Sequence, residues 1–317
     1  MPGVPSIEIL TGDPFSWEIE RAPSAVAIGV FDGVHRGHQA VLRHLTDRAR
    51  EIDGRPIALT FDPHPLEFLD PDRAPDLLTT IDQRARVMES CGVEIMGVLP
   101  FQQIRDLDPT LFAVEILSLR LNARWLTVGD NFRFGRDRTG DADLLRRVGE
   151  RQGFSLDVVS MVGEESESIS STRIRALLAT GDVQGAAVLL GRRFELEGPV
   201  VHGESRGAAI GFRTANLHIP ERMAVPANGV YAVFATVAGT RHRAVVNIGV
   251  RPTFGINTRT VEAHIIDFDE DIYGEDVALE FVDHLRPERR FESLDALVSQ
   301  IGDDLRHAVE ILESTDD

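Results

Sequence analysis

The sequence contains no lysine, so all 33 of its basic residues are arginines. A Walker A loop needs a lysine after its glycines, the protein-kinase fold needs one on a strand, and Schiff-base chemistry needs its amine. The composition therefore excludes these three classes. Any phosphate that the chain binds must be held by arginine, histidine, backbone N–H groups or a metal ion.

Cysteine and long apolar runs are equally scarce. Cys91 is the only cysteine, which excludes intramolecular disulfides and multi-cysteine zinc sites. No apolar run approaches membrane-spanning length and no signal peptide is recognisable, so we expect a cytoplasmic protein without a membrane partner. The net charge of −18 argues against a nucleic-acid partner, and 317 residues are enough for two domains.

One stretch near the N-terminus combines a strand, a break and a helix start. Ala25–Val30 is apolar throughout and predicts a buried strand, and His35-x-Gly37-His38 then opens a helix. A helix N-terminus attracts phosphate, and two imidazoles one turn apart strengthen that attraction. Two solvated histidines are the alternative, and a zinc site fits less well because no third ligand is nearby. The apolar face of this helix comprises Val41, Leu45, Ala49 and Ile52.

Loops with ligand-binding character follow two further predicted strands. Pro56–Phe61 runs into Asp62-Pro63-His64-Pro65, and Trp125–Gly129 runs into Asp130–Gly135. Open α/β sheets bind ligands at such strand ends, although an ordinary proline turn would look similar. Ser170–Thr172 then predicts a second helix N-terminus, with Arg173 beside it as a phosphate donor.

Short strands alternate with helices as far as residue 190, which predicts a parallel, doubly wound sheet. Residues 1–24 are interpreted as a lead-in to it. The other helices are expected at 82–89, 109–119, 142–152 and 183–190, and the other strands at 93–99 and 156–159.

From about residue 191 the pattern changes to β-runs separated by turns, so we place a domain boundary there. The runs at 229–237, 243–250, 260–268 and 276–282 predict a small barrel, closed by a terminal helix over 294–312. A glycine-rich segment at 203–207 leads to Thr214 and Asn216, whose oxygens suit a metal or phosphate. Glu262 and His264 lie on the same face of a predicted strand. The carboxylate of Glu262 could act there as a general base, and the alternative is a solvated strand residue without a catalytic role.

Several motifs together resemble the bacterial bifunctional riboflavin kinase/FMN adenylyltransferase family, the prokaryotic FAD synthetases. The resemblance covers nearly the whole chain from about residue 23. In the first domain it rests on Gly29–His38, Thr60–Pro65, Val128–Gly135 and Ile169–Arg175. In the second it rests on Gly229–Tyr231, Asn247–Phe254, Val261–Glu262 and Asp271–Gly274.

The resemblance implies a Rossmann-like nucleotidyltransferase domain over residues 1–190 and an antiparallel riboflavin kinase barrel over 191–317. The first would join FMN to the AMP part of ATP, giving FAD and pyrophosphate, and the second would phosphorylate riboflavin with ATP and Mg²⁺. It implies catalytic roles for His35, His38 and the base Glu262, and Mg²⁺ and nucleotide ligation by Thr214 and Asn216. The remaining implied binding residues are Gly29, Phe31, Asp32, Gly37, Phe61, Asp62, Pro63, Asn131, Phe132, Phe134, Ser171, Thr172 and Arg173.

The sequence departs from the family pattern beside the predicted metal ligands. The family has a basic residue at 208 and proline at 213, where this chain has Ala208 and Arg213. Arg213 either replaces the missing charge or spoils the kinase site, so one alternative is an adenylyltransferase whose second domain only binds flavin. Two further alternatives are a nucleotidyltransferase with another phosphorylated acceptor and a flavin-binding protein without catalysis.

Overall fold

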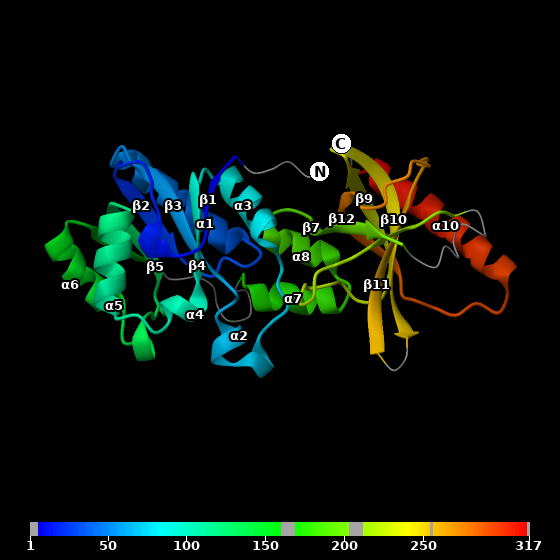
Figure 1. Ribbon diagram of the computed structural model, residues 1–317. Helices are drawn as coiled ribbons and strands as arrows, with labels where there is room; N and C mark the ends of the chain where they lie inside the picture. Colours follow the sequence, from blue (N-terminus) through cyan, green and yellow to red (C-terminus); the bar gives the residue numbers. More distant parts are fainter. Residues whose placement is uncertain (1–5, 160–168, 203–211, 254–255, 316–317) are drawn as a thin grey trace. The chain divides into compact units, whose positions relative to one another are not determined.

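The computed structural model describes residues 6–159, 169–202, 212–253 and 256–315. The contacts divide the chain into two compact units, Pro5–Ser170 and a second from Ser171 onward, shown in Figure 1. Among the helices described, none is long and apolar enough to cross a membrane.

The first unit is built on one sheet in which every strand pair is parallel, in the order β1-β4-β3-β2-β5-β6. β2 lies at its centre and all five of its residues are buried, as expected for a strand covered on both faces. The predicted parallel sheet is confirmed. Its strands are β1 (Glu8–Leu10), β2 (Ser24–Ile28), β3 (Arg55–Asp62), β4 (Ile95–Pro100), β5 (Ala123–Gly129) and β6 (Ser155–Val159).

Helices cover both faces of this sheet. α1 (Arg36–Glu51) and α3 (Ile81–Ser90) pack on one face, against Ala27 and Met96, through side chains such as Leu42. The π-helical segment η3 (Phe112–Arg120) and α6 (Ala142–Gln152) pack on the other. Short segments join them: η1 (Pro14–Ser16), α2 (Leu66–Leu69), η2 (Pro71–Arg73), α4 (Phe101–Ile104), α5 (Pro109–Leu111) and η4 (Arg136–Arg138).

Two predicted segments of this unit differ from the structure. The supposed lead-in 1–24 contains β1, which pairs with β4 at the sheet edge. Three residues are too short for a strand pattern to be read from sequence. The helix expected over 109–119 begins as α5 but continues as the π-helical η3, a change of hydrogen bonding that side-chain periodicity does not report.

One carboxylate fastens α1 to the edge strand β6. Oδ2 of Asp157 in β6 accepts hydrogen bonds from His44 Nε2 at 2.6 Å, Trp125 Nε1 at 2.9 Å and Arg48 Nε at 3.2 Å. Burial raises the pKa of Asp157, but these hydrogen bonds outweigh it and leave the pKa below its usual value. The first helix, whose N-terminus carries the histidine pair, is thereby held against β5 and β6.

The second unit contains a closed antiparallel barrel in the order β10-β11-β8-β7-β12-β9, which confirms the predicted barrel. Its strands are β7 (Phe194–Val201), β8 (Ala215–Leu217), β9 (Gly229–Val237), β10 (Thr240–Thr253), β11 (Ile256–Ile265) and β12 (Asp276–Arg286). β7 and β8 were not predicted. The helices described in this unit are α7 (Ser171–Ala179), α8 (Val183–Leu190) and α10 (Leu294–Glu313), each close to its predicted position.

Helix α8 contacts β7 and β12 of the barrel, and α7 contacts α8. The boundary between the two compact units therefore falls before α7, at Ser171. The functional boundary near residue 190 stays a prediction.

Tyr231 of β9 is fully buried and donates a hydrogen bond to the carbonyl oxygen of Ala227 at 2.6 Å. Burial raises the pKa of Tyr231 to about 12, against a smaller lowering by Arg259.

Candidate functional site

The histidine pair lies where the sequence predicts, at the start of α1. His35 is the N-cap residue, and its Nδ1 accepts a hydrogen bond from the backbone N–H of His38 at 3.3 Å. The two rings stack with centroids 3.7 Å apart and planes 13° apart.

The two histidines differ in exposure and surroundings. His35 is 1% exposed, whereas His38 is half-buried and lines a cavity. Burial is the main cause that lowers the pKa of His38 well below its usual value, and the charges of His35 and Arg84 add to it. His38 is therefore neutral at pH 7, and its buried Nδ1 has no hydrogen-bond partner in the described structure.

The cavity beside His38 has a volume of about 930 Å³ and opens at the carboxyl ends of the strands. The predicted loops after β3 and β5 both reach it. The residues predicted from sequence that line it are Gly29, Phe31, His38, Phe61, Asn131, Phe132 and Phe134.

Aromatic rings form two parts of the cavity wall. Phe61 meets Phe101 edge to face at 5.8 Å, and Phe132 stacks on Phe134 at 5.3 Å. Leu69 at the margin is 48% exposed. Such walls accept a flat aromatic ligand. Phe101 was missed from sequence because it begins the short helix α4, away from any recognised motif.

Other predicted residues of this unit do not line the cavity. Asp32 is buried, and its carboxylate accepts hydrogen bonds from the backbone N–H groups of Leu78 and Thr79. Gly37, Asp62, Pro63 and His35 are also absent from the wall. Their assigned roles as ligand contacts stay predictions.

Ser171, Thr172 and Arg173 form the first turn of α7, as predicted. This turn belongs to the second unit by its contacts. Its expected role in binding the phosphates of ATP stays a prediction.

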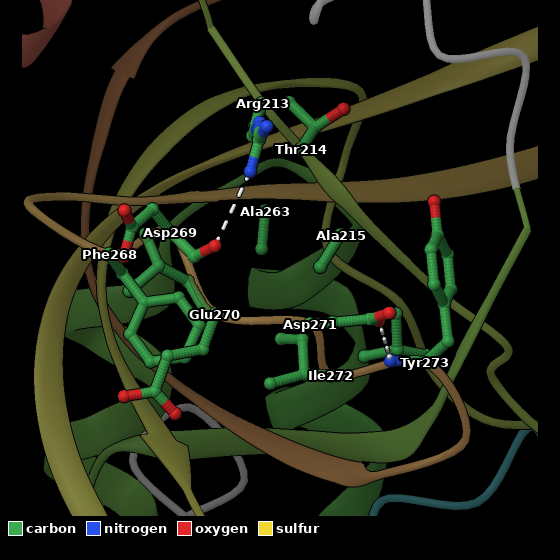
Figure 2. Close-up of a pocket in the computed structure, with 12 residues that line it drawn as sticks. Arg213, Thr214, Ala215, Ala263, Phe268, Asp269, Glu270, Asp271, Ile272 and Tyr273 are labelled. Atoms are coloured by element: carbon green, nitrogen blue, oxygen red, sulfur yellow. Dashed lines mark hydrogen bonds between the residues drawn. The ribbon is translucent and has the colours of Figure 1, made fainter.

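The second unit has a cavity of its own, of about 280 Å³ (Figure 2). Thr214 and Arg213 lie at one side of it, opposite the loop 268–273. The guanidinium of Arg213 donates from Nη1 to the carbonyl oxygen of Asp269 at 3.3 Å, and the backbone oxygen of Arg213 is 2.7 Å from Nδ1 of His264. Arg213 is exposed, and its guanidinium is hydrogen-bonded to the backbone of the cavity loop.

The predicted base Glu262 lies in β11, beside this cavity. Its cross-strand neighbours are Asn216 in β8 and Asn247 in β10. Because side chains alternate along a strand, Glu262 faces away from Ala263, which lines the cavity. The structure therefore brings Glu262 and Asn216 together, with Thr214 in the cavity wall two residues earlier. Ala208 and the segment 203–207 lie outside the described residues.

Comparisons with known proteins cover both units. The sequence model of a family described as FAD synthetase matches residues 18–173, and that of riboflavin kinase matches residues 190–312. A curated relative from Pseudomonas fluorescens, named bifunctional riboflavin kinase/FMN adenylyltransferase, is 40% identical over 91% of this chain and 93% of its own. Relatives of the same name from Escherichia coli K12 and Bacillus subtilis are 38% and 35% identical, over 90% and 92% of this chain and 93% of theirs.

A solved structure is similar over almost its whole length. A chain from Streptococcus pneumoniae, titled a macrolide-efflux protein, matches with a TM-score of 0.83 and 33% identity. The match covers 95% of this chain and 98% of that one. The order of the two units is therefore shared with a solved protein.

Proposed function

The chain belongs to the family of bifunctional riboflavin kinase/FMN adenylyltransferases, and on this premise we propose that each of its two units serves one of the two reactions. The chain carries an FAD synthetase domain and a riboflavin kinase domain. Riboflavin and ATP give FMN and ADP in the kinase reaction. FMN and a second ATP then give FAD and pyrophosphate.

We assign adenylyl transfer to the cavity of about 930 Å³. The observation that carries this assignment is the presence of His38 and two aromatic wall segments in one cavity at the carboxyl ends of a parallel sheet. The aromatic part would hold the flavin ring, and the start of α1 would hold the phosphates of ATP.

The chemistry at this site asks for positioning rather than for a base. A phosphate oxygen of FMN bonds to the α-phosphorus of ATP, the bond to the β-phosphate breaks, and pyrophosphate leaves. Because the FMN phosphate is already an anion, no proton has to be removed from it. Neutral His38 would donate a ring N–H to an oxygen on which charge develops.

We assign riboflavin phosphorylation to the barrel. Riboflavin offers a neutral hydroxyl, so transfer of the γ-phosphoryl group benefits from a carboxylate that takes the proton, and Glu262 is the proposed base. The segment from Thr214 to Asn216 supports this role, because it joins the cavity wall to the cross-strand partner of Glu262.

The donor set beside Glu262 also fits Mg²⁺. A threonine hydroxyl and an asparagine amide oxygen are hard, neutral ligands of the kind that this ion takes when it also binds substrate phosphates. Thr214 and Asn216 would hold it, and the bound ion would neutralise charge on the phosphoryl group. We propose small-molecule substrates as the only partners and a cytoplasmic location, since both reactions consume ATP.

The test is incubation of the whole chain with riboflavin, ATP and Mg²⁺, with the flavins separated by chromatography. We expect FMN and then FAD, and pyrophosphate in step with FAD. Production of FAD from supplied FMN without any FMN from riboflavin would support the alternative, an adenylyltransferase with a flavin-binding barrel. Absence of both products would refute the assignment of a reaction to each unit.

A further inference from the structure

A buried arginine lies beneath the turn that leads into the histidine pair. Arg84 of α3 is 2% exposed and does not line the cavity. Its Nη1 donates to the hydroxyl of Thr60 at 2.8 Å, and that hydroxyl donates to the carbonyl oxygen of Val30, also at 2.8 Å. Its Nη2 lies 3.7 Å from Oδ1 of Asp32, which is equally buried. The guanidinium thus meets the turn at two points.

Asp32 extends this network to the approach of α3. Its carboxylate accepts from the N–H of Leu78 at 3.0 Å and from the N–H and hydroxyl of Thr79 at 3.2 and 3.3 Å. The hydroxyl of Thr79 in turn accepts from the N–H of Gly33 at 3.0 Å. Three segments are therefore joined: the turn after β2, the end of β3 and the start of α3.

The turn held by this network has an unfavourable backbone conformation. Phe31 and Val34 have φ of 51° and 37°, in the left-handed region that side chains such as theirs rarely adopt. Such residues keep their conformation only where the surroundings enforce it, and they concentrate at binding sites. The ring of Phe31 contacts that of His38 edge to face at 5.3 Å, and both residues line the cavity.

We propose that Arg84 is a positioning residue for adenylyl transfer, which holds the turn from Val30 to Val34, and with it His38, in the arrangement that binds the nucleotide. The proposal rests on the proposed function of this cavity. It concerns a residue that does not touch substrate and acts through Thr60 and Asp32. No motif in the sequence pointed to it.

The free-energy cost of burying the charge of Arg84 supports a role for this residue beyond packing. A buried ion pair contributes little net stability, and apolar replacement of such a pair is often neutral. Nε of Arg84 also has no hydrogen-bond partner among the described residues. A charge retained at such a position is explained if it sets the geometry and the field of the turn above it.

The charge of Arg84 acts on the pKa of His38, so the proposal can be tested through the pH dependence of FAD formation. The pKa of His38 is lowered by burial, by His35 and by Arg84, in that order. Removing the charge of Arg84 raises this pKa, so the acid limb of the adenylylation profile moves to higher pH. The other ionisable residues that line the cavity stay in place in every variant: His64, Arg105, Asp106, Arg133, Asp137 and Arg138.

The test compares Arg84→Met with Arg84→Lys and with Met88→Ala in the whole chain. Met88 lies one turn further along α3 and is fully buried in the core, so its truncation weakens the same helix without touching the network. FAD formation from FMN and ATP is measured from pH 5.5 to 8.5, at a temperature where each variant is folded. Riboflavin phosphorylation by the same preparation is the control.

We expect Arg84→Met to lose at least tenfold in kcat/KM for FMN adenylylation relative to Met88→Ala, with its acid limb at higher pH and kinase activity unchanged. Arg84→Lys should recover much of the loss, because it keeps a charge and a donor. Equal rates and equal profiles in Arg84→Met and Met88→Ala would overturn the proposal. Failure of the unaltered protein to make FAD would instead overturn the proposed function.

A second variant keeps the test decisive if Arg84→Met does not fold. Thr60→Val keeps the volume of the side chain but removes the hydroxyl that links Arg84 to Val30. We expect a lower adenylylation rate with unchanged kinase activity. An unchanged adenylylation rate in folded Thr60→Val would equally overturn the proposal.

Discussion

Substitution of the two histidines one at a time separates their roles. His35→Ala removes the N-cap of α1 and a fully buried ring. Loss of a cap costs about 1 kcal/mol and truncation of a large buried side chain costs about 2–5 kcal/mol, so we expect a loss of about 3 kcal/mol or more in the free energy of unfolding.

His38→Ala should behave in the opposite way. The variant loses ring contacts worth about 0.5–1.5 kcal/mol, but it also removes a buried nitrogen without a partner, which relieves about 1–3 kcal/mol. Stability should therefore change little. The rate of FAD formation should fall by about 10²–10³, the loss typical of one donor to developing charge.

Urea unfolding and FAD formation by chromatography measure both effects, with riboflavin phosphorylation in the same samples as the control. The rate of folded His35→Ala should fall less than that of His38→Ala. The reasoning fails if His35→Ala keeps full stability, or if His38→Ala is strongly destabilised while it still makes FAD at the normal rate.

Three further substitutions test other parts of the structure. Asp157→Asn should be less stable than the unaltered protein at pH 7, and the difference measured by urea unfolding should shrink as the pH falls below about 4, because a lowered carboxyl pKa stabilises only above it. Tyr231→Phe loses the hydrogen bond to Ala227, costing about 1 kcal/mol at pH 7. Only the unaltered protein should then lose stability between pH 10 and 12 through titration of this tyrosine, since its pKa rises to about 12 on folding; a parallel loss in Tyr231→Phe would contradict this. Arg213→Pro loses a hydrogen bond worth about 0.5–1.5 kcal/mol and gains about 0.4–1 kcal/mol from the proline, so folding stability should change little. Riboflavin phosphorylation should stay within about threefold, because Thr214, Asn216 and Glu262 are unchanged, with FAD formation from FMN as the control. A large gain in kinase rate would show that the arginine impairs the site.

The parts of the site that were predictable are those encoded locally. The strand, the break and the helix start around His35 follow from a short apolar run and a capped helix, and the structure places them as expected. The loops after β3 and β5 were found for the same reason, because each follows a recognisable strand. Side-chain periodicity and turn residues carry this information within one segment.

What remained hidden depends on contacts between distant segments. Arg84 looks like an ordinary helical arginine until folding brings it to Asp32, and no spacing rule connects the two. Asp32 was expected to meet a ligand, yet its carboxylate is taken up by backbone donors from the approach to α3. Strands of three residues, such as β1 and β8, give too few positions for a pattern.

The edges of the first sheet bear on how this protein avoids aggregation. Of its described strands, β1 and β6 lie at the two edges, whereas the barrel closes on itself and leaves no edge. Exposed edges invite pairing with other chains, and natural proteins blunt them with short strands or inward-pointing charges. β1 has only three residues, and β6 carries Asp157, whose carboxylate finds its donors only on α1 and β5 of its own fold. A β6 strand that left its own fold to join a foreign sheet would carry this charge without those donors, so the residue that fastens the first helix also disfavours such exchange.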